Sequence, residues 1–211
     1  MLVRFPDDEF ALLKKIILVY EWGQKLLLTK LDVICEDFKY FHKNNPIENI
    51  RSRIKAPESI AGKLAKAGME LTAENARLHV KDIAGIRIIC TFARDIYTLA
   101  DIIRSMPDSK VLLEKDYIGN PKPSGYRGFH MHVEVPVFHS GNIEYVLVEV
   151  QIRTAAMDFW ATLEHKVKYK YHEHIPQYLS DELIVCADKT AELDEQMYTI
   201  HEIISMLNHD L

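Results

Sequence analysis

Cysteine is scarce in this sequence, and the few cysteines lie far apart. Cys35, Cys90 and Cys186 are odd in number, and each stands among apolar neighbours. This pattern argues against both a disulfide framework and a zinc cage, because either would need grouped or paired thiols. It favours a reducing compartment, so we expect a cytoplasmic protein.

Long apolar runs are also missing. The longest run of large apolar residues, 16–20, is far shorter than the ~20 residues that a membrane-spanning helix needs. The first ten residues carry Asp7, Asp8 and Glu9 where a secretory signal would need basic residues. We therefore expect no membrane partner.

Several motifs are absent. No Gly-x4-Gly-Lys-Ser/Thr segment occurs, which excludes a P-loop nucleotide-binding protein. His130 and His132 would share a strand face, but no third histidine or suitably spaced glutamate accompanies them, so a transition-metal site is not expected. Neither repeats nor a linker divide the chain, and we predict one domain over 1–211.

The net charge of −5 is unevenly distributed. Residues 51–66 hold five basic residues and one acidic residue, whereas 180–211 hold eight acidic residues and one lysine. A basic cluster in a chain of pI about 6.1 favours a local phosphate site over an extended nucleic-acid track. Single-stranded RNA stays open as a partner, without a specific indication.

Hydrophobic periodicity predicts the elements of the N-terminal third. Spacings of three and four predict helix over about 7–43, with Gly23 as a break that would give two helices within 1–44. Asn44, Asn45 and Pro46 form a stop signal. A short strand over 47–55 and a helix over 57–68 follow.

The remaining elements alternate between strand and helix. We predict a buried strand over 83–92, a helix over 95–106, and antiparallel strands over 129–137 and 143–152 joined through 140–142. The segment 116–130 holds three glycines and two prolines and is expected to be a mobile, irregular loop resembling a lid.

Two helices are predicted to close the chain. Their apolar stripes are Trp160, Leu163, Val167 and Tyr171 in the first, and Leu193, Met197, Ile200, Ile204 and Leu207 in the second. The resulting fold class is α/β (α+β), with a mixed, largely antiparallel central sheet flanked by helices. Residues 45–175 would form the core, and 176–211 a C-terminal helix.

The strand over 145–153 separates its side chains onto two faces. Its even-numbered residues are all apolar, while Glu149, Gln151 and Arg153 share the opposite face with Tyr145 and Leu147. That face is either a solvated outer surface or a functional surface, and the strand alone does not decide between them.

A second carboxylate, Asp82, stands at the opening of the 83–92 strand. Together with Glu149 and substrate phosphates it would make a magnesium site, because Mg²⁺ takes one or two protein carboxylates and keeps several waters. The alternative is that Asp82 caps a turn. Asp82 and Arg87 are an odd number of residues apart, so a regular strand would place their side chains on opposite faces of the sheet. A bulge at Gly85 would bring them to the same face.

Cationic groups outnumber these two acids. They are Arg53, Lys55, Lys63, Arg87, Lys122, Arg127 and Arg153. Such an excess fits recognition of one or two polyphosphates, although scattered surface salt bridges would explain any single lysine. Ser59 and Lys63 would share one face near the start of the 57–68 helix, where anions are favoured. Tyr126, in a flexible loop, could stack on a base. His130 could contact a phosphate or act as a proton partner.

Four segments together resemble the synthetase domain of the RelA/SpoT alarmone family. They are SRIKAPESIAGKL, KDIAGIRIIC, DYIGNPKPSGYRGFH and VEVQIRTAAMDFWATLEHKVKYK, which span roughly 45–175. The resemblance implies a nucleotidyltransferase-like fold and a stand-alone small alarmone synthetase without a hydrolase domain. Such an enzyme transfers the diphosphate of ATP to the 3′-hydroxyl of GDP or GTP, with Mg²⁺ as cofactor.

The resemblance also implies roles for individual residues. Arg53 and Arg87 would clasp the ATP adenine, and Lys55, Ser59 and Lys63 would hold the ATP phosphates. Asp82 and Glu149 would bind magnesium, with Glu149 also activating the attacking hydroxyl. Tyr126 would stack on the guanine, surrounded by Lys122, Arg127, His130, Gln151 and Arg153.

Three positions depart from the family pattern or bear on assembly. Asp158 stands where some members have an asparagine that reads the guanine edge, and a carboxylate could still accept from guanine N–H groups. Asn49 and Arg51 replace residues of the activator cleft, so we expect no strong activation by the product. The family resemblance implies a homotetramer. The apolar stripe of the C-terminal helix is a candidate interface, or it covers the core of the same chain.

Two rival functions remain. One is a toxic relative that modifies adenosine nucleotides or the 3′ end of tRNA with the same fold and carboxylates. The other is a catalytically silent nucleotide or RNA-binding module.

Overall fold

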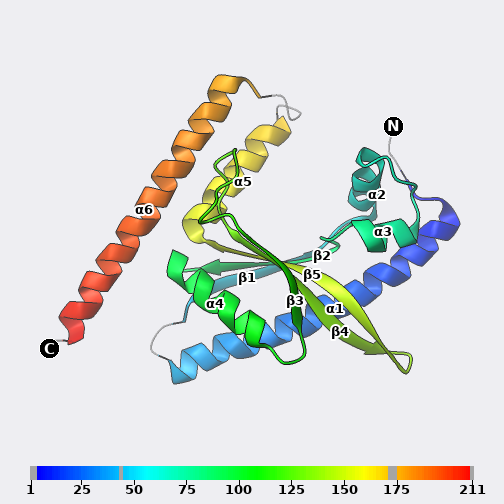
Figure 1. Ribbon diagram of the computed structural model, residues 1–211, viewed down its shortest axis with the longest axis horizontal. Helices are drawn as coiled ribbons and strands as arrows, with labels where there is room; N and C mark the ends of the chain where they lie inside the picture. Colours follow the sequence, from blue (N-terminus) through cyan, green and yellow to red (C-terminus); the bar gives the residue numbers. More distant parts are fainter. Residues whose placement is uncertain (1–3, 43–44, 171–174, 210–211) are drawn as a thin grey trace.

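A five-stranded sheet forms the centre of the protein (Figure 1). The computed structural model describes residues 4–42, 45–170 and 175–209. The strand order is β1-β2-β5-β4-β3, with bounds Ile47–Ile54 (β1), Ala84–Cys90 (β2), Lys110–Asp116 (β3), Phe129–His139 (β4) and Asn142–Thr154 (β5). The β2–β5 pair is parallel and the other neighbouring pairs are antiparallel. The predicted mixed, largely antiparallel sheet is confirmed.

Helices flank this sheet on several sides. They are α1 (Asp7–Phe41), α2 (Pro57–Lys66), α3 (Ala73–His79), α4 (Ala93–Ser105), α5 (Ala155–Lys170) and α6 (Gln177–His209). None of the helices in the described ranges is both long and apolar enough to cross a membrane. In Figure 1, α1 and α4 lie below the sheet, whereas α2 and α5 lie above it and are separated from each other.

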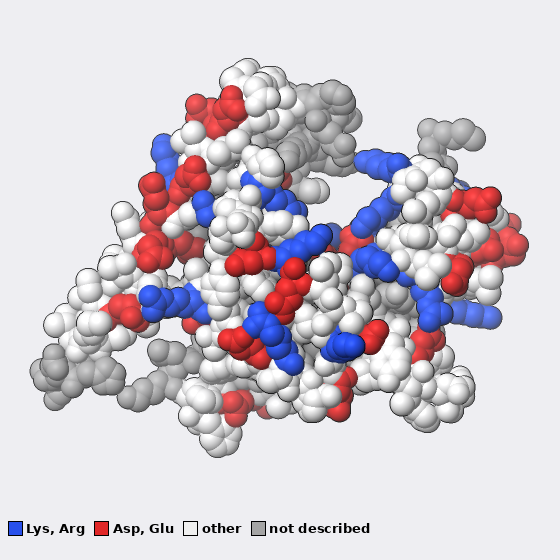
Figure 2. All heavy atoms as spheres, viewed as in Figure 1, with Lys and Arg blue, Asp and Glu red and all other residues white. Residues whose placement is uncertain are grey.

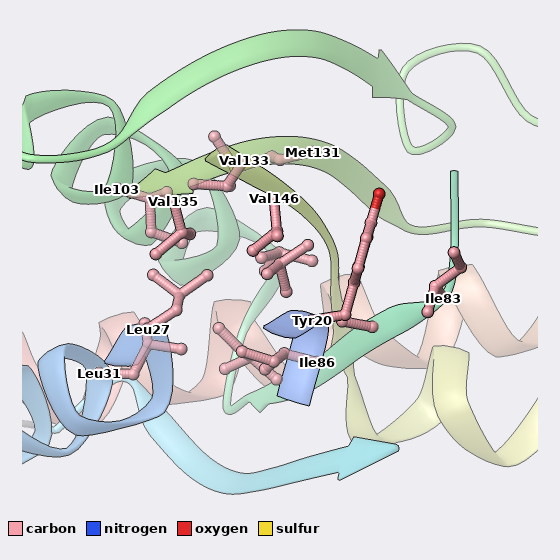
Figure 3. Packing of buried hydrophobic residues seen from close by; sticks show 14 of the residues in the cluster. Tyr20, Leu27, Leu31, Ile83, Ile86, Ile103, Met131, Val133, Val135 and Val146 are labelled. Atoms are coloured by element: carbon pink, nitrogen blue, oxygen red, sulfur yellow. The ribbon is translucent and has the colours of Figure 1, made fainter. Parts of the chain in front are cut away.

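The strand alternation predicts the core correctly. Val146, Val148, Val150 and Ile152 of β5 are buried, together with Met131, Val133 and Val135 of β4. Side chains from α1 (Leu27, Leu31) and α4 (Ile103) belong to the same buried cluster (Figure 3). The apolar face of the sheet is therefore covered by helices, and the polar side chains of β5 lie on the opposite face.

The hairpin is also confirmed. β4 and β5 pair along their whole length up to His139 opposite Asn142, so Ser140 and Gly141 form a two-residue turn. Both turn residues have positive φ, 49° and 79°, which is the geometry that matches the right-handed twist of the flanking strands.

Two elements went unpredicted. α3 is only seven residues long and is capped by the preceding Thr72, whose side-chain oxygen accepts from the backbone N–H of Asn75 at 3.1 Å. β3 is an exposed edge strand whose pairing with β4 shifts between Val111 and Leu113, so its alternation is interrupted. Asn44 and Tyr171, which the sequence placed at a helix end and in an apolar stripe, lie outside the described residues.

The predicted break at Gly23 is wrong, because α1 is one continuous helix of 35 residues. Gly23 lies where α1 crosses β5, and a Cβ there would be 2.2 Å from Cγ2 of Val146 and 3.3 Å from Cγ2 of Val137. The adjacent Gln24 is buried and donates to the carbonyls of Arg53 (2.7 Å) and Gly85 (3.0 Å). The glycine therefore permits close packing of helix on sheet.

Gly23→Ala should destabilise the protein by about 1–3 kcal/mol, because overpacking outweighs the gain in helix propensity. Gly62→Ala is the matched control: Gly62 is also helical, and a Cβ there meets nothing within 4 Å. It should be neutral or stabilising by up to about 1 kcal/mol. Urea unfolding measures both. Equal effects of the two substitutions would contradict the packing role of Gly23.

Candidate active site

The open face of the sheet carries a row of polar side chains from four strands. In the strand register Arg53 lies opposite Gly85, Gly85 beside Glu149, and Gln151 opposite His130. Arg87 lies beside Gln151. Lys and Arg side chains gather around the hollow between α5 and α2 (Figure 2). Arg53 and Gln151 each line three cavities on this face, so the cavities form one continuous site.

The two predicted metal-binding carboxylates line the same cavity. Asp82 accepts from Nζ of Lys55 at 2.7 Å and from Nζ of Lys63 at 2.9 Å. Glu149 accepts from Nε2 of Gln151 at 2.9 Å, and its other oxygen lies 3.5 Å from Nδ1 of His130. Two acids from distant parts of the chain thus face one polar space.

The predicted bulge at Gly85 is wrong. β2 pairs with both neighbours through Gly85 without a register shift, and Asp82 lies in a turn before the strand begins. Strand parity therefore does not apply to Asp82, and the conflict with Arg87 does not arise. The two oxygens of the Asp82 carboxylate accept from Lys55 and Lys63, so these lysine side chains orient it.

Both carboxylates are held ionised. Burial raises the pKa of Asp82, but the hydrogen bonds from Lys55 and Lys63 outweigh burial and leave the pKa below its ordinary value. Burial likewise raises the pKa of Glu149, and His130 with Gln151 more than offsets it. Burial lowers the pKa of His130 despite Glu149, which favours a neutral imidazole. At neutral pH the cavity therefore presents two anionic carboxylates.

Five side chains close a ring of polar contacts on the β4–β5 side of the site. Nη2 of Arg153 donates to Oε1 of Gln151 (2.8 Å) and to the hydroxyl of Tyr126 (2.7 Å). That hydroxyl lies 2.5 Å from Nε2 of His130, and the ring continues through Glu149 back to Gln151. Each member fixes the orientation of the next.

Tyr126 differs from its prediction. The sequence indicated a loop residue that gains little from packing, but its side chain is 9% exposed and packs with Trp160, Ala161 and Ala187. Nζ of Lys122 lies 4.7 Å from the centre of its ring. The residue is thus a buried anchor of the loop as well as a member of the polar ring.

The loop over 117–128 is irregular, as predicted, and is hydrogen-bonded internally. The N–H of Gly125 donates to the carbonyl of Lys122 at 2.8 Å, and Asp116 accepts from the N–H of Ile118 at 2.8 Å. Gly125 has φ of +86° and lies directly against α6, where an added Cβ would be 2.7 Å from Cβ of Ala187. The loop therefore docks on the C-terminal helix.

Not every predicted residue reaches the cleft. Nη2 of Arg127 donates to Asp188 of α6 at 3.2 Å, and Arg127 lines none of the three cavities that Arg53 and Gln151 share. Ser59 is exposed on α2, one turn before Lys63. Asp158 accepts from Nη1 of Arg87 (3.1 Å) and from Nη1 of Arg153 (3.2 Å).

Sequence reasoning missed part of the lining. Leu113, Lys115 and Tyr117 line the cavity that holds both carboxylates, and so does His132, which had been considered only as a metal ligand. The first three come from β3 and the start of the loop. No strand was predicted there because the register shift at Leu112 hides the alternation. Only the pairing of β3 with β4, which is a contact between distant segments, identifies this strand.

Within the described ranges, no group of three or more His, Cys, Asp or Glu side chains is arranged to hold a metal ion. Two carboxylates, however, suffice for Mg²⁺ when phosphate oxygens and water complete its ligands. A sheet face with two ionised carboxylates ringed by lysine and arginine is typical of enzymes that transfer phosphoryl groups between nucleotides.

The comparison with known proteins agrees with this class. Residues 52–174 match the family model described as "Region found in RelA / SpoT proteins", and the chain belongs to this family. It is 44% identical over 187 residues to the GTP pyrophosphokinase YwaC of Bacillus subtilis, covering 89% of each chain. Identity to the GTP pyrophosphokinase YjbM of the same organism is 35%, covering 89% of this chain and 87% of the relative.

Solved structures agree as well. The small alarmone synthetase 1 of Bacillus subtilis, bound to its product pppGpp, superposes with a TM-score of 0.84 at 34% identity, over 90% of this chain and 97% of that one. The small alarmone synthetase 2 of Bacillus subtilis gives 0.81 at 42% identity, with the same coverage. The RelA/SpoT resemblance and the fold class are thereby confirmed.

Gly125→Ala should displace the loop from α6, because the new Cβ collides with Ala187. Gly141→Ala is the matched control: its φ of +79° is equally unfavourable for alanine, at about 1–2 kcal/mol, but its Cβ meets nothing within 4 Å. In a Trp22→Phe background, Trp160 is the single tryptophan. Its fluorescence should shift to the red in the first variant alone. An unshifted spectrum would contradict the docking contact.

Proposed function

We propose that this chain is a GTP/GDP pyrophosphokinase that transfers the β,γ-diphosphate of ATP to the 3′-hydroxyl of GDP or GTP, making ppGpp or pppGpp. The observation that carries the proposal is the pair Asp82 and Glu149, ionised in one cavity and surrounded by cationic side chains. The identity to GTP pyrophosphokinases over most of the chain supports it.

The donor nucleotide is assigned to the β1–β2 side of the site. Arg53 and Arg87 lie on adjacent strands and line two cavities together, which supports their role on either side of the adenine. Lys55, Ser59 and Lys63 are assigned to the ATP phosphates. The two lysines now neutralise Asp82, and they can turn to phosphate oxygens when nucleotide and cation enter.

Mg²⁺ is the proposed cofactor, held by Asp82 and Glu149, and it supplies neutralisation of phosphate charge when bound. The donor set fits this ion, because both ligands are hard carboxylate oxygens with lowered pKa. Lys122 lines the same cavity and adds positive charge beside the transferred diphosphate. Catalysis is then mainly alignment and charge compensation.

Glu149 orients the acceptor hydroxyl and takes its proton. A carboxylate with a lowered pKa is a weak base, so the proton moves late, as the hydroxyl oxygen bonds to the β-phosphorus of ATP. The bond between that phosphorus and the oxygen of the α-phosphate breaks in the same displacement, and AMP leaves. Gln151 and His130 hold the carboxylate in place from opposite sides. The acceptor nucleotide is assigned to Lys122, Tyr126, His130, Gln151 and Arg153. Arg127 can contact the acceptor nucleotide only if its side chain leaves Asp188 and binds a phosphate of the acceptor instead.

Glu149→Gln should reduce kcat by on the order of 10²–10⁴-fold, the usual contribution of a positioned base, and should leave binding of a non-hydrolysable ATP analogue in the absence of Mg²⁺ unchanged. Glu144→Gln is the control, since Glu144 lies on the same strand but pairs with His139 away from the cleft. Products from γ-labelled ATP are separated after incubation with Mg²⁺ and GTP, GDP, GMP or no acceptor.

Labelled guanosine tetra- or pentaphosphate is the expected product. Parallel reactions with ATP alone and with uncharged tRNA test the rival functions. A product formed only on adenosine nucleotide or tRNA would replace the guanosine acceptor, and no product with any acceptor would favour the binding-only alternative. Full turnover by the Glu149→Gln variant would refute the assignment of the base.

The proposed assembly is a homotetramer, with α6 in its interface. Leu193, Met197, Ile200, Ile204 and Leu207 of α6 are 50–61% exposed in the single chain, which supports burial against another copy. Strong activation by the product is not expected, given Asn49 and Arg51. The thiols of Cys35, Cys90 and Cys186 are free, which supports the expected cytoplasmic location.

Ile200→Asp combined with Ile204→Asp should convert the tetramer to smaller species, because two carboxylates would be buried without partners. Light scattering after size-exclusion chromatography measures the mass. Glu195→Asp, an exposed conservative change on the same helix, serves as the control. An unchanged tetramer in the double variant would place the interface elsewhere, and a monomeric parent protein would refute the tetramer.

A further inference from the structure

Asp158 occupies an unexpected position between two arginines. It lies in the first turn of α5, and its side chain is 14% exposed. A single oxygen, Oδ1, accepts from Nη1 of Arg87 at 3.1 Å and from Nη1 of Arg153 at 3.2 Å. Arg87 comes from β2 and Arg153 from the end of β5, so one carboxylate connects two strands with a helix.

The two guanidinium groups need this carboxylate. Arg153 is only 6% exposed and cannot turn out to solvent, while its other donors are engaged by Tyr126 and Gln151. Burial and then Arg153 lower the pKa of Arg87, whereas Asp158 acts in the opposite direction. Without the negative charge of Asp158, two partly buried cations would repel each other across the cleft.

The location of the pair matters for the reaction. Arg87 lines the cavity assigned to the donor base, together with Arg53. Arg153 belongs to the polar ring that holds Tyr126 and Gln151 on the acceptor side. We propose that Asp158 is a positioning residue that joins the donor and acceptor halves of the site through Arg87 and Arg153, and that it is not the reader of the guanine base. This inference rests on the proposed function, which assigns Arg87 to the donor nucleotide and Arg153 to the acceptor nucleotide.

The two roles give different kinetic results for Asp158→Asn. A base reader contacts the acceptor alone, so its loss would change the preference for GDP over inosine diphosphate, which lacks the 2-amino group. A positioning residue acts on both halves. We therefore expect KM to rise about tenfold for both ATP and GDP, the scale of losing a hydrogen bond to a charged group, with an unchanged ratio of kcat/KM for GDP and inosine diphosphate.

The experiment compares the full-length protein with three variants. Asp158→Asn removes the charge and keeps the size. Asp158→Glu keeps the charge and should restore part of the affinity for both nucleotides. Asp101→Asn is the matched control, because Asp101 also pairs with an arginine, Arg104, but on the far side of the fold in α4. Circular dichroism and urea unfolding establish that each variant is folded.

A rise in the KM of GDP alone, with loss of the preference over inosine diphosphate, would overturn the proposal in favour of base reading. Unchanged constants for both nucleotides would overturn it as well. Calorimetry with a non-hydrolysable ATP analogue tests the donor half without turnover, and affinity should fall about tenfold in Asp158→Asn.

The proposed function can fail separately. If the parent protein makes no guanosine product, double-mutant cycles of unfolding free energy still measure the coupling of Asp158 to Arg87 and to Arg153. Significant coupling in both pairs would retain Asp158 as the bridge between the strands, and independent effects in either pair would refute it.

Discussion

The parallel pairing of β2 with β5 is the contact on which the rest of the site depends. It places Gly85 beside Glu149 and Arg87 beside Gln151 on one face, while the intervening residues of both strands enter the core. Because side chains alternate, a slip of one residue between the strands would bury the charges and expose the valines. The same hydrophobic burial that stabilises the sheet therefore also fixes the register of the polar groups.

The sequence predicted those parts of the molecule that depend on local patterns. The alternation of β5 identified both the buried face and the face of Glu149, because period-two burial is a property of one segment. Gly23 and Tyr126 were misread since their surroundings come from distant residues, Val146 for the first and Ala187 for the second. Long-range contacts of this kind leave no signature in the segment itself.

The site combines strong charge with few free groups. Asp82 is held by two lysines, Asp158 by two arginines, and Glu149 by an amide and an imidazole. Because each carboxylate has hydrogen-bonding partners, the free-energy cost of burying its charge in a partly enclosed cleft is reduced. It also means that the polar side chains are oriented before any nucleotide arrives, which lowers the entropic cost of alignment in the proposed reaction.

The closed ring around Glu149 has a further consequence for the chemistry of water. A base that can activate a ribose hydroxyl can also activate a water molecule, and a kinase that does so wastes its donor. In the structure Gln151 and His130 occupy the carboxylate oxygens of Glu149. An incoming acceptor nucleotide makes many contacts, which can offset the free-energy cost of displacing Gln151 and His130 from Glu149. A single water molecule makes too few contacts to do so. In the proposed reaction, these contacts of Glu149 would therefore disfavour hydrolysis of ATP before the second nucleotide is in place.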